Sequence, residues 1–227
     1  LNNKEVFVNI DDAIQNEKTE KIKRYTFSQK TNNSDLYISN IEANPMVTIS
    51  YNDIKIHSSL IGVYNANNIN AAILIGKHFG VDDNDIKDAI EIYTPENNRS
   101  QIIYKNGNEI ILDAYNANPS SMNAALINFY QLNKNSKIAI LGDMFELGNE
   151  SHEEHKKIIE QALNYHDVET FFIGKYFYKA QISSKHLKYF ENFEDFSNFI
   201  TLNPILNSLI LIKGSRGMAL ERILEKM

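Results

Sequence analysis

The stretch "ILDAYNANPSSMNAAL", residues 111–126, decides the fold class of this chain. An apolar run ends at Asp113, a polar segment follows, and the chain then takes up a helical pattern of apolar residues. Asn118 suits the N-cap of that helix, and Pro119 suits its first position. A strand that leads at once into a helix is the unit from which α/β folds are built.

The same junction carries polar residues that helix capping does not require. Asp113 closes the strand, and a carboxylate at the carboxyl end of a strand suits the hydroxyl pair of a ribose. Tyr115 offers an aromatic face to a base, and Asn116 follows it. From these residues alone, a helix start and a nucleotide site explain the junction equally well.

Strands and helices alternate on both sides of this junction. Asn106-Gly107 suits the tight turn of a hairpin over residues 101–113. The later pattern predicts helices over 120–132, 151–163, 193–200 and 217–227 and strands over 137–143, 169–174 and 208–214. Such alternation predicts an α/β domain with a mainly parallel sheet, whose ligands lie beyond the carboxyl ends of the strands.

The first part of the chain has a different pattern. Residues 4–60 contain short β-branched and aromatic runs, and Asn52-Asp53 suits a hairpin turn between two of them. Two helices are predicted after these strands, over 66–80 and 82–93.

Turn and cap residues set the limits of these two helices. Gly80 suits the end of the first, and Asp82 or Asp83 suits the start of the second. Pro95 then interrupts the helical pattern, and the strand and helix alternation begins after it. The predicted domains are therefore 1–95 and 96–227.

Composition excludes several classes of protein. The chain has 227 residues, of which 43% are hydrophobic and 23% charged, as in ordinary globular proteins. Its net charge of −6 argues against nucleic acid as a partner, and the lack of cysteine excludes disulfides and thiolate metal sites. No apolar run is long enough to span a membrane, so we expect a cytoplasmic protein without a membrane partner. The chain starts at Leu1, close to a first strand-like run, and we expect it to be a piece of a longer protein.

A second polar cluster follows a predicted strand in "LIKGSRGMALERIL". Lys213, Ser215 and Arg216 lie between a strand and a helix, with glycines that permit close backbone approach. Cations and helix-end N–H groups together outline an anion site. A solvated basic turn explains the same residues, and the spacing of a phosphate-binding P-loop occurs nowhere in the sequence.

The third cluster, "LGDMFELGNESHEEH", begins with Asp143 after a strand. Ser151 and Glu154 have the spacing of a capping box for the next helix. His152 and His155 are candidates for metal ligands, but they lack the His-Glu-x-x-His spacing. Acids in the first turn of a helix are explained by the helix dipole, so no metal ligand is predicted.

Three more polar residues lie outside these clusters. Arg99 stands in the segment after Pro95, where it can reach a phosphate or remain solvated. Asn65 and Asn68 precede or begin a helix, and capping alone can account for them.

Taken in order, five strings resemble the Mur ligases, which build the peptide of peptidoglycan precursors: "GVYNANNINAA", "PENNRSQ", "DAYNANPSSMNAAL", "ILGDMFELGNESHEEH" and "LIKGSRGMALERIL". The "YNANPSSM" and "LGDM-ELG" strings are similar to the branch that adds D-alanyl-D-alanine to UDP-N-acetylmuramoyl-tripeptide. The resemblance covers essentially the whole chain. It implies an ATP-dependent enzyme with an N-terminal substrate domain, a central ATPase domain and a Rossmann-like C-terminal domain.

The resemblance also implies roles for the polar residues. Arg99 and Lys213 would be the catalytic cations, and Arg99 would reach the terminal phosphates of ATP. Ser215 and Arg216 would face the substrate when the domains close. The residues expected beside the nucleotide are Asn65, Asn68, Asp113, Tyr115, Asn116 and Asn118.

The chain departs from the family pattern at several points. The P-loop, the Mg²⁺-binding Glu and His and the modified lysine have no counterpart in it, so ATP and Mg²⁺ would be bound largely by residues outside this chain. Tyr64 stands where many relatives have His. We therefore expect the end of the central domain over 1–95, the C-terminal domain over 96–227, a monomer, and no ligation or ATP hydrolysis by this polypeptide alone.

Two other interpretations stay open at this level. One is a nucleotide-binding module without catalytic activity. The other is an α/β interaction domain in which the junctions only cap helices, and it predicts no change of melting temperature with ATP and Mg²⁺.

Overall fold

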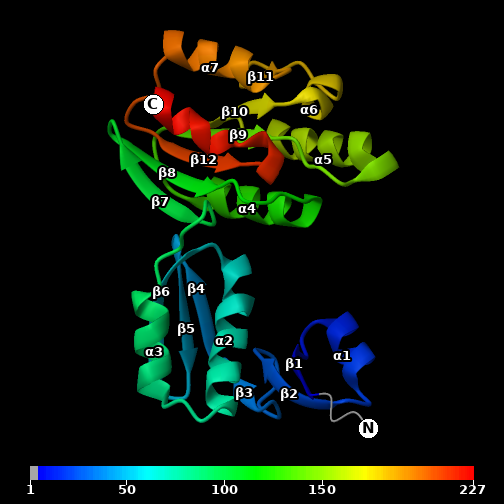
Figure 1. Ribbon diagram of the computed structural model, residues 1–227, viewed down its shortest axis with the longest axis vertical. Coiled ribbons are helices and arrows are strands. Elements are labelled where there is room, and N and C mark those ends of the chain that lie inside the picture. Colours follow the sequence, from blue (N-terminus) through cyan, green and yellow to red (C-terminus); the bar gives the residue numbers. More distant parts are fainter. Residues whose placement is uncertain (1–4) are drawn as a thin grey trace. The chain divides into compact units, whose positions relative to one another are not determined.

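The computed structural model describes residues 5–227, which form two compact units that divide between Thr94 and Pro95 (Figure 1). The first unit holds two three-stranded sheets, one parallel and one antiparallel. The parallel sheet contains β1 (Glu5–Asn9), β2 (Lys23–Ser28) and β3 (Leu36–Tyr37), and the antiparallel sheet contains β4 (Asn40–Ala43), β5 (Met46–Tyr51) and β6 (Ile54–Ile61). Its helical segments are α1 (Ala13–Thr19), the 3-10 turn η1 (Val63–Asn65), α2 (Ala66–His78) and α3 (Asp83–Ile92).

Helix α2 holds the first unit together because it packs on both sheets. Its apolar residues Ile69 and Ile73 lie in one core with Phe27 from β2 and Ile49 from β5. Figure 1 shows α2 and α3 on either side of the β4–β6 sheet.

The turns of this unit agree with the sequence prediction. Asn52 takes a left-handed φ of 47° between β5 and β6, and Gly80 takes one of 75° after α2. Asp82, and not Asp83, caps α3 by accepting a hydrogen bond from the N–H of Asn84 at 2.9 Å.

The second unit is built on a six-stranded sheet in the order β11-β10-β9-β12-β8-β7. Five strands run parallel, and β7 pairs antiparallel with β8, so the predicted mainly parallel α/β fold is confirmed. The strands are β7 (Gln101–Lys105), β8 (Asn108–Asp113), β9 (Lys137–Gly142), β10 (Val168–Ile173), β11 (Leu187–Phe190) and β12 (Leu209–Lys213). The predicted hairpin turn lies between β7 and β8, where Asn106 and Gly107 have φ values of 49° and 76°.

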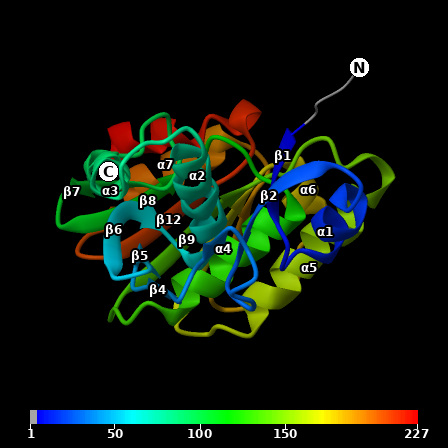
Figure 2. The same ribbon diagram turned by 90° about the horizontal axis from the view of Figure 1, so that it is seen from below.

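Helices cover both faces of this sheet. The helices are α4 (Pro119–Gln131), α5 (Ser151–Leu163), α6 (Lys175–Lys179) and α7 (Phe193–Leu202), with 3-10 segments η2 (Gly148–Glu150), η3 (Arg216–Met218) and η4 (Leu220–Lys226). Figure 2 shows α4 and α5 on one side of the sheet and α7 with the C-terminal segment on the other. The core under α7 and η4 contains Phe196 and Leu220 together with alternate strand residues, such as Ile110 and Leu112 of β8. Side chains of successive residues in a strand point to opposite faces of the sheet, so alternate residues face this core.

Two predictions about helix ends are wrong. The segment after β12 is two 3-10 pieces rather than one α-helix, because Ala219 has a left-handed φ of 47° and interrupts the helical hydrogen bonding. Ser151 is the first residue of α5 and not its cap, and its hydroxyl lies 3.4 Å from Nδ1 of His155. A capping box requires a non-helical residue at the Ser position, and Glu150 occupies the cap position instead.

No helix within residues 5–227 is both long and apolar enough to cross a bilayer.

Candidate functional site

The register of the parallel sheet brings three polar strand ends together. Lys213 at the end of β12 pairs with Asp113 of β8 on one side and with Leu141 of β9 on the other. Asp143 follows Leu141 after one glycine. The clusters that the sequence predicts after β8, β9 and β12 are therefore neighbours at one edge of the sheet.

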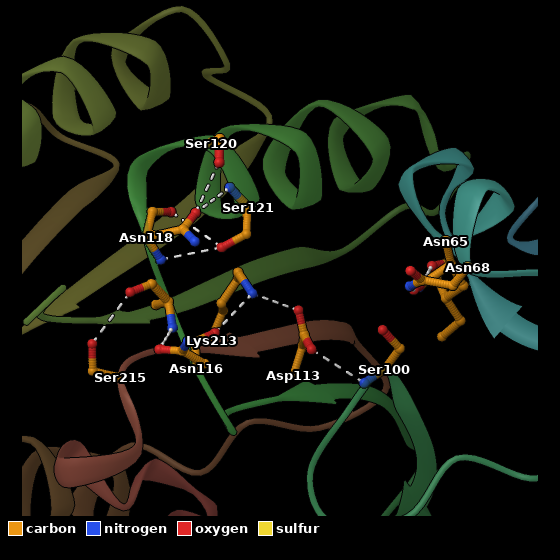
Figure 3. Close-up of polar contacts among 12 residues, drawn as sticks. Asn65, Asn68, Ser100, Asp113, Asn116, Asn118, Ser120, Ser121, Lys213 and Ser215 are labelled. Atoms are coloured by element: carbon orange, nitrogen blue, oxygen red, sulfur yellow. Dashed lines mark hydrogen bonds and ion pairs between the residues drawn. The ribbon is translucent and has the colours of Figure 1, made fainter. Parts of the chain in front are cut away.

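The centre of this edge is an ion pair between Asp113 and Lys213 (Figure 3). Nζ of Lys213 lies 2.6 Å from Oδ2 of Asp113, and the two side chains are only 3% and 13% exposed respectively. Lys213 also donates to the carbonyl of Asn116 at 3.3 Å, and Asp113 accepts from the N–H of Ser100 at 3.2 Å. The pair thus ties β8 and β12 to the β8–α4 loop and to the segment before β7.

Local hydrogen bonds organise the junction between β8 and α4. Asn118 caps α4 as predicted: its Oδ1 accepts from the N–H of Ser121 at 2.8 Å, and Ser121 Oγ accepts from the N–H of Asn118. Oδ1 of Asn116 accepts from the N–H of Ala117 at 2.8 Å. These contacts fix the loop backbone and leave both side-chain amide nitrogens without a protein partner among the described contacts.

Two arginine side chains lie close to the ring of Tyr115. Cζ of Arg99 lies 3.8 Å from the centre of this ring, and Cζ of Arg216 lies 5.6 Å from it. The ring of Tyr115 therefore lies close to two cations. Arg216 also lies 3.9 Å from Oε1 of Glu221.

Ser215 is 5% exposed, and its hydroxyl points into the protein. Its Oγ accepts from the N–H of Phe145 at 2.9 Å and donates to the carbonyl of Ala117 at 3.4 Å, a contact drawn in Figure 3. The serine therefore joins the β12–η3 turn to the loops after β8 and β9. Its predicted place beside the substrate stays a prediction.

Asp143 has a structural contact that the sequence did not reveal. Its carboxylate accepts from the N–H groups of Tyr176 at 3.1 Å and Phe177 at 3.0 Å, in the first turn of α6. A Cβ at Gly174 would lie 2.3 Å from this carboxylate, so only glycine fits there, with its φ of 123°. The only sequence signal is the glycine itself at the end of β10.

His155 lies next to Asp143 and is fully buried. Its Nε2 accepts from the N–H of Met144 at 3.0 Å, and Nδ1 donates to the carbonyl of Ser151 at 2.6 Å, which together define a neutral ring. Burial lowers the pKa of His155, and burial raises the pKa of the nearby Asp143 carboxyl. His155 thus joins the loop after β9 to the first turn of α5, and Asp143 joins that loop to α6.

In the first unit, the side chains of Asn65 and Asn68 are hydrogen-bonded to each other. Nδ2 of Asn68 donates to Oδ1 of Asn65 at 3.1 Å, and Asn65 donates to the carbonyl of Ile61 at 2.7 Å (Figure 3). Asn65 is 8% exposed and lies at the start of α2. Their predicted role at the adenine stays a prediction.

Acids and histidines do not gather into a metal site within residues 5–227, where no group of three could hold an ion. The polar residues at the strand ends of the second unit supply cations, amides and the carboxylate of Asp113.

Two family models match the chain. The Mur ligase glutamate ligase domain matches residues 98–216, and the Mur ligase middle domain matches residues 1–76. The chain belongs to the Mur ligase family. The family resemblance drawn from the five strings is thereby confirmed.

Among curated Mur ligases, the UDP-N-acetylmuramoyl-tripeptide--D-alanyl-D-alanine ligase of Borreliella burgdorferi is 33% identical over 170 residues. The match covers 73% of this chain and 37% of that protein. The matched segment thus spans well under half the length of that relative.

Solved Mur ligase structures share the fold. MurF from Acinetobacter baumannii superposes with a TM-score of 0.82 at 24% identity, over 99% of this chain and 51% of that one. MurF from Thermotoga maritima, solved in complex with ADP, gives 0.78 at 19% identity, over 98% of this chain and 52% of that one. These likenesses support the Rossmann-like assignment of the second unit.

Proposed function

We propose that this chain is part of an ATP-dependent ligase that joins D-alanyl-D-alanine to UDP-N-acetylmuramoyl-tripeptide. The observation that carries the proposal is the match of both Mur ligase domains, combined with the carboxylate and cations that meet at the strand ends of the second unit. The curated relative with the printed activity is 33% identical to this chain over 73% of the chain's length. ATP and a UDP-linked substrate suit a cytoplasmic protein, and we propose a monomer.

In the proposed reaction the terminal carboxylate of the tripeptide attacks the γ-phosphorus of ATP, which gives an acyl phosphate and ADP. The amine of D-alanyl-D-alanine then attacks the acyl carbon, loses a proton, and expels phosphate. An acyl phosphate hydrolyses readily, so the site has to exclude water before it forms. Closure of a mobile domain over the bound nucleotide is a common means to that end.

The proposed nucleotide residues have contacts that suit the task. Asp113 accepts one protein hydrogen bond at each carboxylate oxygen, from Lys213 and Ser100, so each oxygen retains a lone pair for a ribose hydroxyl. Asn116 and Asn118 retain side-chain N–H donors, and Asn65 and Asn68 are proposed near the adenine.

The proposed cations of the site have different roles. Arg99 would neutralise charge on the terminal phosphates, and Arg216, with Ser215, would face the substrate. Lys213 is buried against Asp113, so within this proposal it acts by orienting that carboxylate. We propose that ligands for Mg²⁺ come from outside the described residues.

The test uses the protein encoded by the reading frame that contains this chain. Arg99→Ala should lower kcat/KM for ATP by about 30-fold or more, since a hydrogen bond to a charged group contributes about 2 kcal/mol. The melting temperature should stay near that of the unmodified protein, because Arg99 is not in a core. Arg222→Ala is the matched control, because Arg222 stacks on Phe193 at 3.9 Å elsewhere in the unit. Equal kinetics for the two variants would remove Arg99 from the nucleotide site.

Asp113→Asn tests the ribose contact in the same assay. The variant should discriminate less between ATP and 2′,3′-dideoxy-ATP than the unmodified protein does, because the carboxylate that would accept from the hydroxyls is gone. Unchanged discrimination would contradict the assignment of Asp113.

A further inference from the structure

Two arginine side chains of the second unit lie against one tyrosine ring. Arg99 comes from the segment before β7 and Arg216 from the turn after β12, and both lie within about 6 Å of the Tyr115 ring centre, the range of cation–π attraction. Tyr115 is 37% exposed, so one part of its ring stays at the surface. The ring is the feature that the two cations share.

The backbone around Arg99 is held in an unusual conformation. Asn97, Asn98 and Ser100 have left-handed φ values of 58°, 59° and 49°; asparagine tolerates this region, whereas serine adopts it only at a cost. Such a conformation persists only where the surroundings enforce it. Here the N–H of Tyr115 donates to the carbonyl of Asn98 at 3.2 Å, and the carboxylate of Asp113 accepts from Ser100 (Figure 3).

The charges near the ring leave both arginines able to bind an anion. Asp113 is the nearest acid on β8, and Lys213 already neutralises it at 2.6 Å. Glu221 lies 3.9 Å from Arg216, at the outer limit of an ion pair, and the Arg216 side chain is 61% exposed. Two guanidinium groups repel each other, and the electron-rich ring face offsets part of that repulsion.

We propose that Tyr115 is a positioning residue whose ring holds Arg99 and Arg216 together as a clamp for phosphoryl oxygens. Guanidinium groups bind phosphoryl oxygens in pairs of parallel hydrogen bonds, and two of them match a group with several such oxygens. The clamp itself follows from the geometry, whereas its natural ligand, the ATP tail or an acyl phosphate, rests on the proposed function. Tyr115 then shapes the site through the arginines, instead of stacking on a base as the sequence suggested.

The test titrates the 227-residue chain with inorganic tripolyphosphate and, separately, with acetyl phosphate, and follows the arginine Nε–H signals by NMR. The signals of Arg99 and Arg216 should shift together. Tyr115→Leu should weaken binding about five- to tenfold, and Tyr115→Phe, which keeps the ring, should bind like the unmodified chain. Tighter binding of tripolyphosphate would identify the ATP tail as the ligand, and tighter binding of acetyl phosphate would identify the acyl phosphate.

Tyr104→Leu is the matched control, because Tyr104 is 75% exposed on β7 and, among residues 5–227, no Lys or Arg side chain lies over its ring. This variant should bind both probes like the unmodified chain. In the Arg99→Ala background, Tyr115→Leu should cost less than it does alone, because one of the two cations that the ring holds is gone.

Three results would overturn the clamp: no binding of either probe, equal binding by Tyr115→Leu and Tyr115→Phe, or a shift of only one arginine signal. Each leaves the ligase proposal untouched, since that proposal is tested by turnover. Conversely, a Tyr115-dependent clamp in a protein without ligase activity supports the clamp and removes its assignment to ATP.

Discussion

Replacement of Lys213 by Met should destabilise the second unit by about 3 kcal/mol. The substitution keeps an unbranched side chain one heavy atom shorter and removes its charge, so Asp113 stays nearly buried without its partner. Removal of one member of a buried ion pair costs roughly 3–5 kcal/mol. We take the lower end because the Asp113 side chain is 13% exposed and retains the hydrogen bond from Ser100.

A double-mutant cycle tests the ion pair between Lys213 and Asp113 more directly. Asp113→Asn alone leaves Lys213 buried and charged, so it should cost about as much as Lys213→Met. The double variant buries no charge, and it should cost less than the sum of the single variants by about 2 kcal/mol or more. Urea unfolding followed by circular dichroism, fitted to the transition of the second unit, measures all three values.

A more exposed ion pair of similar length provides the control. Lys134 lies 2.7 Å from Glu109, but its side chain is 52% exposed, so Lys134→Met should have a much smaller effect than Lys213→Met. Costs that add within error in the cycle, or a Lys213→Met variant as stable as Lys134→Met, would refute the buried-pair account.

Three further predictions concern the structure around the site. Burial lowers the pKa of His155 from 6.5, so the unfolded chain takes up a proton below that pH while the folded chain does not, and stability should fall by at most about 1.4 kcal/mol per pH unit in that window. Urea unfolding at pH 7.5 and 5.5 should show this fall in His152→Gln but a smaller one in His155→Gln, and equal falls would contradict it. Gly174→Ala should lower stability by more than about 2 kcal/mol, because the new methyl group meets the Asp143 carboxylate at a left-handed φ; a neutral result in a thermal melt would exclude that clash. Asn118→Ala should cost about 1 kcal/mol as a lost N-cap, and Asn118→Ser should restore most of it in the same melts.

Local sequence signals predicted much of the second unit. Asn106-Gly107 and Asn118-Pro119 each determine backbone conformation through their own chemistry, so the hairpin and the start of α4 follow from the residues. The prediction of one helix at the end of the chain was wrong, because the left-handed conformation at Ala219 depends on tertiary packing. No glycine or asparagine stands at this position to indicate it.

Only the location of the site, at the carboxyl ends of the parallel strands, was predictable from the sequence. Parallel strands place their carboxyl ends together, so polar residues after β8, β9 and β12 were expected to be neighbours. Their partners were not predictable: Lys213 meets Asp113 across 100 residues, and this depends on strand order. The arginines on Tyr115 and the inward turn of Asp143 depend likewise on contacts between loops that no local pattern records.

We propose that this chain is part of an enzyme that ligates D-alanyl-D-alanine. The most direct measurement is ADP formation by the protein from the reading frame that contains this chain, with ATP, Mg²⁺ and UDP-N-acetylmuramoyl-tripeptide, with and without D-alanyl-D-alanine. We predict that steady ADP formation requires the dipeptide and equals the amide product one to one. Steady ADP formation without the dipeptide, or with another amine in its place, would contradict the claim.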